Sequence, residues 1–237
     1  MYIDIHNHSL YGVDDGAKTY EDSVAMLKEA YRQQIEAVVL TPHYRHGMFE
    51  YPKERVERHF EKLKEAADTI GIRIYLGCEY HVDSDIVENM GNGRCHTLAG
   101  GDYVLTEYSG ETEYSKIEKY TRQLLSNGYL PVIAHVERYA CFLKKPALCA
   151  ELSDMGALIQ INADSVLGMD GRMAAHFTKK LLKHEWADIV ASDTHDMRER
   201  ANHMEQCFQY VAKKYGESYA KWLFYRNPEK IIRVENK

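Results

Sequence analysis

Seven short apolar stretches alternate along this chain with longer stretches in which apolar residues recur at helical spacing. The seven have the length of β-strands and cover residues 3–8, 37–41, 72–76, 103–105, 130–134, 158–161 and 188–191. Such an alternation predicts a parallel sheet with helices packed outside it, because a parallel crossover needs a connection of helix length. All seven strands then run in one direction, and in a barrel their C-terminal ends share one face.

Helices are predicted between and after these strands, at residues 19–33, 52–70, 86–90, 114–126, 146–155, 173–184, 202–215 and 218–225. Asn227 and Pro228 are expected to stop the last helix, with a short apolar tail after them. Two arrangements of the sheet fit this pattern, a closed barrel and an open, doubly wound sheet. A Gly-x-Gly-x-x-Gly motif after the first strand, which would suggest a dinucleotide site in an open sheet, is absent.

The composition is that of an ordinary globular protein: 45% of the 237 residues are hydrophobic and 28% are charged. The net charge is −6 and no basic stripe occurs, so binding to a nucleic-acid backbone is not favoured. The apolar stretches are too short to span a bilayer, and the first residues lack the pattern of a secretion signal. Five scattered cysteines without a Cys-x-x-Cys pair indicate reduced thiols and a cytoplasmic location. Since barrels of this length form one unit, we expect a single domain over residues 1–237.

Histidines and carboxylates recur where the predicted strands end. His6 and His8 end the first strand, and residues two apart on a strand face the same side, so both imidazoles can bind one metal ion. The other candidates at strand ends or in the loop after the first strand are Asp14, Asp15, His43, Glu79, Glu107, His135, Asp193 and His195. Scattered core histidines would not all fall at the same end of the strands. A mixture of imidazole and carboxylate ligands without cysteine suits manganese, iron or zinc, and this number of ligands suits two or three ions.

Several metal ions with a bridging carboxylate favour phosphoester hydrolysis. Two ions about 3.5–4 Å apart clamp an in-line displacement at phosphorus and lower the pKa of bound water. A cluster of positive charge also offsets the charge of a phosphate group. A cysteine phosphatase is not indicated, because none of the five cysteines is followed by an arginine six residues later.

The motifs around these residues resemble those of the PHP (polymerase and histidinol phosphatase) superfamily. They are Ile-Asp-Ile-His-Asn-His at 3–8, Thr-Pro-His at 41–43, Glu79, Ile-Ala-His-Val-Glu-Arg-Tyr at 133–139 and Ala-Ser-Asp-Thr-His at 191–195. Within that superfamily the chain is similar to the bacterial manganese-dependent tyrosine phosphatases of capsular and exopolysaccharide operons. This closer similarity covers almost the whole chain and adds Val-Asp-Asp-Gly at 13–16, Arg-His-Gly-Met-Phe at 45–49 and Asn-Pro-Glu-Lys-Ile-Ile at 227–232.

The resemblance implies a distorted (β/α)7 TIM-like barrel of the PHP type with a trinuclear metal centre. Matched by position, the first ion takes His6, His8, Glu79 and Asp193. The second ion shares Glu79 and takes Glu107 and His135. The third ion takes Asp15, His43 and His195, and Asp15 rather than Asp14 matches the liganding aspartate of the family.

Two arginines match the phosphate-binding arginines of the family, Arg138 and Arg200. The choice between Arg198 and Arg200 stays open, because the two lie close together in one loop. Through a free ring nitrogen or a water molecule, His43 or His195 is a candidate to assist the departing phenolate.

The implied activity is that of a metal-dependent protein-tyrosine phosphatase with two or three divalent ions, chiefly manganese. The implied substrate is the phosphotyrosine tail of a bacterial tyrosine autokinase, and the controlled process is capsular or exopolysaccharide synthesis. Two alternatives stay open: a PHP phosphoesterase that acts on a small molecule such as histidinol phosphate, and a degenerate metal-binding scaffold. Residues 108–115 and 164–172, which border the expected pocket, match the family only loosely, so substrate preference is the least constrained inference.

Overall fold

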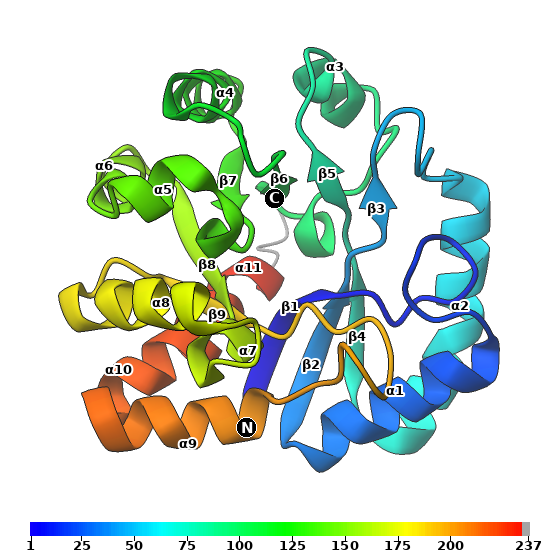
Figure 1. Cartoon of the computed structure of the whole chain (residues 1–237). Helices are drawn as coiled ribbons and strands as arrows, with labels where there is room; N and C mark the ends of the chain where they lie inside the picture. Colours follow the sequence, from blue (N-terminus) through cyan, green and yellow to red (C-terminus); the bar gives the residue numbers. More distant parts are fainter. Residues whose placement is uncertain (234–237) are drawn as a thin grey trace.

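The computed structural model describes residues 1–233 and consists of parallel strands with helices outside them (Figure 1). Its strands are β1 (Tyr2–Asn7), β2 (Ile35–Leu40), β3 (His43–Tyr44), β4 (Arg73–Leu76), β5 (Glu79–His81), β6 (Tyr103–Glu107), β7 (Leu130–Ile133), β8 (Leu158–Asn162) and β9 (Ile189–Ala191). All seven predicted strands are present. The short strands β3 and β5 were not predicted.

Strands β3 and β5 continue β2 and β4 after a break. The β2–β4 ladder pairs Leu40 with Leu76, and the β3–β5 ladder resumes with His43 opposite Glu79, at the same offset along the chain. Across the break, Gly77 N donates to Leu40 O at 2.8 Å and Glu79 N donates to Pro42 O at 3.2 Å. Pro42 has no N–H for the ladder, which interrupts the pairing locally. The break therefore lies just before the predicted metal ligands His43 and Glu79, and it leaves these two residues adjacent on neighbouring strands.

The strand positions form a ring. Pairing gives the orders β1-β2-β4 and β3-β5-β6-β7-β8-β9, all parallel. The segment after β9 then returns to β1: His8 N donates to Thr194 O, and Asp193 N donates to His6 O, both at 2.9 Å. With β2/β3 and β4/β5 counted as interrupted strands, this is the distorted (β/α)7 barrel that the sequence resemblance implied.

The helices lie around the outside of this ring, except α11, which appears in its middle in Figure 1. They are α1 (Tyr20–Arg32), α2 (Lys53–Ile70), α3 (Ile86–Gly91), α4 (Tyr114–Ser126), α5 (Ala140–Lys144), α6 (Leu148–Asp154), α7 (Ala163–Leu167), α8 (Arg172–His184), α9 (Met204–Tyr215), α10 (Glu217–Lys221) and α11 (Asn227–Ile232). Short 3₁₀ turns lie at η1 (Leu98–Gly100) and η2 (Val136–Arg138). The five-residue helices α5 and α7 follow β7 and β8 and were not predicted.

The prediction that Asn227 and Pro228 stop the last helix was wrong. The chain passes from α10 through a π-helical turn, η3 (Trp222–Arg226), directly into α11. Pro228 lies in the first turn of α11, where a backbone N–H is not needed. The apolar tail is therefore helical.

Two apolar clusters lie inside and outside the ring of strands. The inner cluster takes residues two apart on a strand, such as Ile3 and Ile5, which matches the alternation of side chains on a β-strand. Ile231 and Ile232 of α11 pack into this inner cluster. The larger outer cluster fills the space between strands and helices. The packed interior of the barrel leaves the strand ends as the place for polar chemistry.

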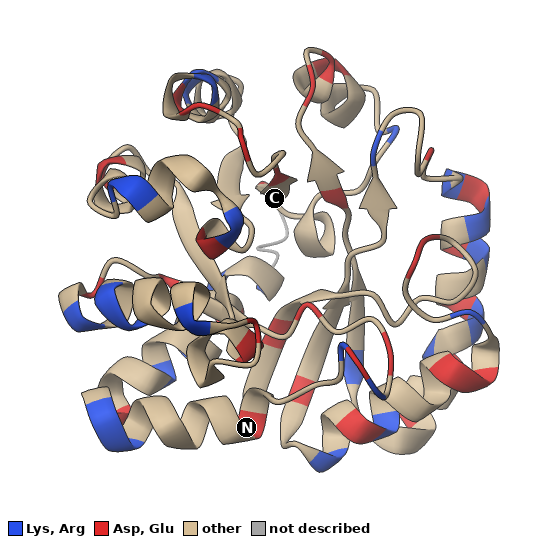
Figure 2. Cartoon of the chain, in the orientation of Figure 1, with Lys and Arg blue, Asp and Glu red and all other residues tan. Residues whose placement is uncertain are grey.

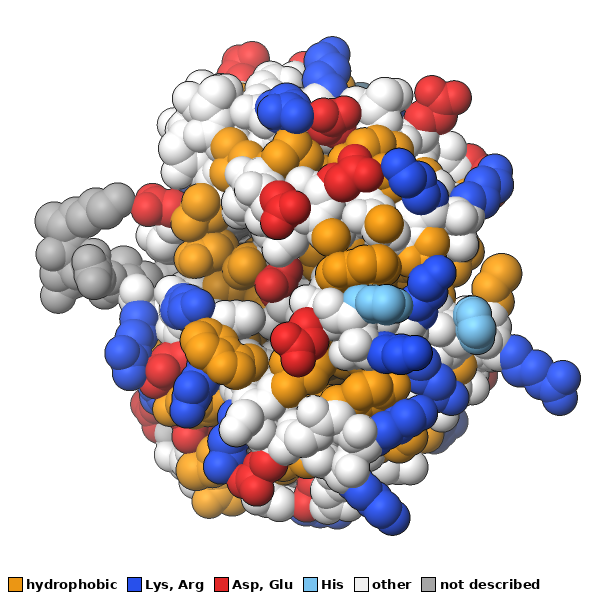
Figure 3. All heavy atoms as spheres, turned by 90° about the vertical axis from the view of Figure 1, so that its left-hand side faces the viewer, with side chains coloured by type: hydrophobic (Ala, Val, Ile, Leu, Met, Phe, Trp, Pro, Cys, Tyr) orange, Lys and Arg blue, Asp and Glu red, His pale blue; other side chains and the backbone are white. Residues whose placement is uncertain are grey.

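The surface carries charges of both signs. Lys and Arg lie mainly on the outer helices, with Asp and Glu among them (Figure 2). On the face shown in Figure 3, apolar side chains form patches that charged side chains interrupt. Among the described helices, none is both long enough and apolar enough to cross a membrane.

Candidate metal centre

The nine residues predicted to bind metal lie together at the C-terminal ends of the strands. The structure forms three groups in which the possible ligand atoms lie within 4.8 Å of one another. The groups are His6, His8, Glu79 and Asp193; His8, Asp15, His43 and His195; and His43, Glu79 and Glu107. His135 joins them through Glu79, whose Oε1 lies 2.9 Å from His135 Nε2.

The first group is the set predicted for one ion, and it is fully buried. His6 Nε2 lies 3.2 Å from His8 Nε2, 3.1 Å from Glu79 Oε2 and 3.3 Å from Asp193 Oδ1. His8 Nε2 lies 3.3 Å from Glu79 Oε2 and 3.5 Å from Asp193 Oδ1. Four potential ligand atoms from three different strand ends thus face one point.

The other ring nitrogens of these histidines fix which atoms are free to bind metal. His6 Nδ1 donates to Gln160 Oε1 at 3.1 Å, and His8 Nδ1 donates to Asp14 Oδ2 at 2.9 Å. In a neutral imidazole the second nitrogen then carries a lone pair. Both Nε2 atoms are therefore acceptors, and they point at two carboxylate oxygens that are also acceptors. In the neutral rings such an arrangement needs a proton or a metal ion between the acceptors.

Two buried acceptor atoms of the centre receive no hydrogen bond from the described residues, Glu79 Oε2 and His195 Nε2. His43 Nδ1 lies 2.9 Å from Glu79 Oε2, but without the alignment of a hydrogen bond. Buried polar atoms without a partner are rare in folded proteins. A divalent cation would satisfy both atoms, so this donor set fits a metal centre of imidazole and carboxylate ligands.

The second group is more open to solvent. Asp15 Oδ1 lies 3.3 Å from His43 Nε2 and 3.5 Å from His195 Nε2, and the Asp15 side chain is 44% exposed. His195 Nδ1 donates to the backbone oxygen of Asp193 at 2.9 Å. Burial and the neighbouring His8 lower the pKa of His195 to about 4, so this ring is neutral at pH 7. Its unpartnered Nε2 is then the atom that can bind a cation.

Neighbouring Asp14 and Asp15 have different surroundings. Asp14 is buried under the imidazole of His8 and also accepts a hydrogen bond from His43 N at 3.0 Å. Asp15 instead points its carboxylate at His43 and His195. The structure thus places Asp15 among the possible ligand atoms and Asp14 behind one of them.

Glu79 connects the groups. Its Oε2 faces His6, His8 and His43, whereas its Oε1 faces His135. A carboxylate with one oxygen on each side has the geometry of a bridging ligand. His135 Nε2 also lies 4.0 Å from Glu107 Oε1, which extends the cluster toward the end of β6.

Both predicted arginines reach this centre. Arg138 Nη2 lies 2.8 Å from Asp193 Oδ2. Arg200 Nη2 lies 3.2 Å from both oxygens of Asp193, and its Nη1 lies 3.6 Å from Asp15 Oδ2. The two side chains are 41% and 38% exposed, so a phosphate group can reach them. Arg198 is exposed, and its backbone N–H donates to Asp196 Oδ1.

Without a metal ion, the negative charge of the centre holds protons on His6 and His43. Burial would lower the pKa of His6, but Glu79 and Asp193 raise it to about 9. Burial would also lower the pKa of His43, but Glu79 and Asp15 raise it to about 11. Burial would raise the pKa of Glu79, yet His6 and His43 hold it well below its ordinary value. Metal binding would replace these protons.

Two residues of the centre have an unusual backbone conformation. His135 has φ 31° and Asp193 has φ 53°, in the left-handed region that most side chains avoid. Each lies at the end of its strand, after β7 and β9. Strain of this kind persists where the surrounding structure imposes it and is concentrated at functional sites.

Sequence reasoning missed two residues that hold the ligands. Gln160 accepts hydrogen bonds from His6 Nδ1 and from His135 N, at 3.1 and 3.0 Å. His81 Nδ1 lies 2.9 Å from Glu107 Oε2. The sequence signal that could have revealed Gln160 is an amide side chain inside an otherwise apolar strand. His81 had no such signal, because it lies in β5, a strand that was not predicted.

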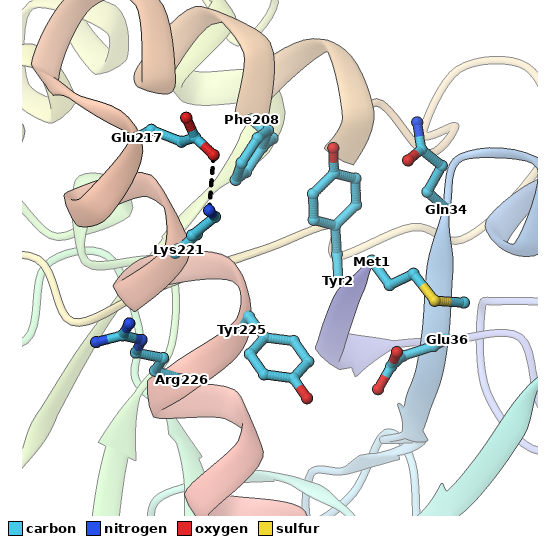
Figure 4. Close-up of a pocket in the computed structure, with 9 residues that line it drawn as sticks. All are labelled: Met1, Tyr2, Gln34, Glu36, Phe208, Glu217, Lys221, Tyr225 and Arg226. Atoms are coloured by element: carbon cyan, nitrogen blue, oxygen red, sulfur yellow. Dashed lines mark ion pairs between the residues drawn. The ribbon is translucent and has the colours of Figure 1, made fainter.

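Among the cavities between described residues, two lie outside the ligand cluster. One of about 360 Å³ adjoins it and is lined by Glu137, Arg138, Leu143, Ser165, Asp170, Met173 and Ala174. The other, of about 650 Å³, includes Met1 and Tyr2 (Figure 4) and lies where β1 begins, at the other end of this strand from His6. In it, Lys221 and Glu217 form an ion pair at 2.7 Å, and none of its nine lining residues belongs to a metal-binding group. The second cavity is therefore not the chemical centre.

A parallel barrel whose strand ends gather imidazoles and carboxylates around shared points defines a metal-dependent hydrolase of the barrel type. The model of the family described as "Capsular polysaccharide synthesis, CpsB/CapC" matches residues 2–233. The chain belongs to this CpsB/CapC family, which is involved in capsule synthesis and has the PHP-type fold implied by the sequence motifs.

Relatives agree with this assignment. The "Tyrosine-protein phosphatase CpsB" of Streptococcus pneumoniae is 37% identical over 237 residues, which cover 97% of this chain and 98% of the relative. A solved structure from work on YwqE of Bacillus subtilis and CpsB of Streptococcus pneumoniae, described as unique metal-dependent tyrosine phosphatases, superposes with a TM-score of 0.87. It is 28% identical and covers 98% of this chain and 94% of its own. The structure of the lactonase Lmo2620 of Listeria monocytogenes superposes with a TM-score of 0.65 and covers 99% of this chain and 95% of its own. At 11% sequence identity, this similarity shows the fold alone.

Proposed function

We propose that this chain is a metal-dependent protein-tyrosine phosphatase and that residues 1–237 form its single catalytic domain. The observation that carries the proposal is the convergence of His6 Nε2, His8 Nε2, Glu79 Oε2 and Asp193 Oδ1 on one point. Family membership and the name of the pneumococcal relative support the same activity.

The proposed metal ligands overlap the three groups of the centre and add His135, which reaches them through Glu79. One ion is held by His6, His8, Glu79 and Asp193. A second shares Glu79 and is held by Glu107 and His135. A third is held by Asp15, His43 and His195. The ligand set suits manganese, with iron or zinc as alternatives.

Divalent ions at this centre would supply a water molecule with a lowered pKa and positive charge opposite the phosphate. The chain itself positions those ions and the substrate. Gln160 and Asp14 fix the rings of His6 and His8 through their Nδ1 atoms. Arg138 and Arg200, which are partly exposed beside Asp193, bind the phosphate oxygens and stabilise charge that develops on them.

His43 and His195 act as ligands rather than as proton donors to the leaving group. Both ring nitrogens of His43 face carboxylates, Glu79 and Asp15, and His195 Nδ1 is bound to a backbone oxygen. A phenolate leaving group has a pKa of about 10, so it needs less protonation than an alkoxide. This chemistry therefore favours an aryl phosphate substrate.

The proposed substrate is the phosphotyrosine tail of a bacterial tyrosine autokinase, and the proposed role is control of capsular or exopolysaccharide synthesis in the cytoplasm. The family description supports the link to capsule synthesis. The cavity of about 360 Å³ beside Arg138 offers room for residues that flank the phosphotyrosine.

Steady-state kinetics on a phosphotyrosine peptide and on histidinol phosphate test this function. The protein is first stripped with a chelator and then reloaded with Mn²⁺. We expect activity only after reloading, with the higher kcat/KM on the peptide. Glu79→Gln should abolish activity, whereas His176→Gln, an exposed histidine on α8, serves as the matched control. A large preference for histidinol phosphate would contradict the proposal, and activity that persists after complete chelation would contradict its metal dependence.

A further inference from the structure

The segment directly after β3 folds into a tight hairpin over residues 45–50. Arg45 and Phe49 exchange two backbone hydrogen bonds, both 2.8 Å long. At the tip, Gly47 has φ 77°, and its N–H donates to Glu50 Oε1 at 2.8 Å. The backbone of this 45–50 hairpin is therefore closed on itself, and it holds the Phe49 side chain in a defined place.

Phe49 packs against the metal centre and not against the core. Its ring centroid lies 5.2 Å from that of His43, with 14° between the two planes. Among the described residues, Phe49 belongs to neither apolar cluster nor to the side chains packed against them. Its ring is only partly buried. Burial in the core therefore does not explain the apolar side chain at this position.

The remaining neighbours of His43 are polar. The His8 ring packs against the His43 ring with 4.4 Å between the centroids. Glu79 and Asp15 face the two ring nitrogens of His43. Phe49 thus presents an aromatic surface at the rim of an otherwise charged site. If the phosphoryl oxygens of a bound ester contact the ligand groups and the arginines, its leaving group lies outside the cluster, and Phe49 is an aromatic surface available to it there.

We propose that Phe49 contacts the aromatic ring of the substrate and thereby selects aryl phosphates over alkyl phosphates. Aromatic rings pack favourably in offset or edge-to-face contacts, whereas an alkyl ester offers little surface to such a wall. The inference rests on the proposed phosphatase activity and adds the residue that recognises the tyrosyl ring.

The test compares five full-length proteins loaded with Mn²⁺: wild type, Phe49→Ala, Phe49→Tyr, Met48→Ala and, from the cavity beside Arg138, Met173→Ala. Met48 is the matched control, because it lies in the same hairpin and its side chain is 60% exposed. Two quantities are measured for each protein, kcat/KM on a phosphotyrosine peptide and the inhibition constant of inorganic phosphate, which has no ring. Metal content and Tm are measured to show that each variant is folded and loaded.

We expect Phe49→Ala to lower kcat/KM on the peptide about three- to tenfold, mainly through KM, since one aromatic contact is lost. Its inhibition constant for phosphate should stay within twofold of wild type. Phe49→Tyr should restore peptide turnover, and Met48→Ala should leave both quantities unchanged.

Three results would overturn the inference. Equal weakening of peptide turnover and phosphate inhibition by Phe49→Ala would mean that the ring only supports His43. No change in either quantity would mean that it has no role. A loss confined to Met173→Ala would place the substrate ring in the cavity beside Arg138 instead. A wild-type protein that fails to hydrolyse the peptide at all would contradict the proposed function itself, which is a different result from these three.

Discussion

His6 and His8 point their Nε2 atoms at each other across 3.2 Å, although the opposite nitrogen of each ring already holds the hydrogen. Two lone pairs at that distance repel each other, so a proton or a metal ion must lie between them, and in the metal-free protein the raised pKa of His6 keeps a proton there. Glu79 and Asp193 add two carboxylate oxygens to the same point. Much of the chain's chemistry follows from this one arrangement.

Gln160→Met should weaken metal binding about 10- to 100-fold, which is the usual effect of removing a residue that orients a metal ligand. The substitution keeps the side-chain volume but removes the acceptor for His6 Nδ1. Competition for Mn²⁺ against a fluorescent chelator measures the affinity. Gln206→Met on the exposed face of α9 is the control, and equal affinities for the two variants would refute a positioning role for Gln160.

Asp14→Asn and Asp15→Asn should have different effects although the residues are adjacent. Asp15 faces His43 and His195, so its substitution should lower the number of ions bound per chain by about one. Asp14 lies behind His8, so its substitution should weaken affinity and leave that number unchanged. Metal analysis after equilibration with excess Mn²⁺ and rapid desalting distinguishes the two. Loss of an ion in Asp14→Asn alone would reverse the assignment.

Metal binding should stabilise the protein more at higher pH. In the metal-free protein Glu79 and Asp193 raise the pKa of His6 from 6.5 to about 9, against the effect of burial. A raised pKa means that the protonated ring contributes stability fully below pH 6.5, and that this contribution is lost as the pH rises toward 9. Mn²⁺ competes with that proton. The rise in Tm on adding Mn²⁺ should therefore become larger as the pH is raised by about two pH units, from 6.5 to 8.5. An increment independent of pH would show that no proton is displaced.

Arg138→Ala should raise the inhibition constant of inorganic phosphate about 10- to 100-fold, as expected for the loss of charge-assisted hydrogen bonds. Arg138 is 41% exposed beside Asp193 and can turn toward a bound anion. Arg198→Ala is the matched control, since its exposed side chain lies in the neighbouring loop. If Arg198→Ala weakened inhibition and Arg138→Ala did not, the assignment of the phosphate-binding side chain would be wrong.

The predicted strands and helices match the structure closely, because apolar periodicity reports burial directly. All seven strands are present, and Thr19, where the first helix was predicted to begin, is the N-cap of α1. The short strands β3 and β5 were missed because two or three residues cannot show a period. The helix α11 was missed because Pro228 was interpreted as a stop, although it lies in the first turn of a new helix.

The candidate centre was predictable in its residue types and in its position at one barrel face. Side-chain direction was not predictable. The sequence alone could not show that Asp14 lies behind His8, that Arg200 rather than Arg198 reaches Asp193, or that Gln160 lies under His6. These facts depend on loop conformation and on contacts between distant strands, which no local pattern encodes.

The most direct test is anomalous diffraction from crystals grown with Mn²⁺, recorded above and below the manganese absorption edge. The expected result is a manganese peak at the point bounded by His6 Nε2, His8 Nε2, Glu79 Oε2 and Asp193 Oδ1, with neighbouring peaks beside Asp15 and Glu107. An ordered site without any anomalous peak, in crystals of protein that hydrolyses phosphotyrosine, would contradict a metal centre at these strand ends.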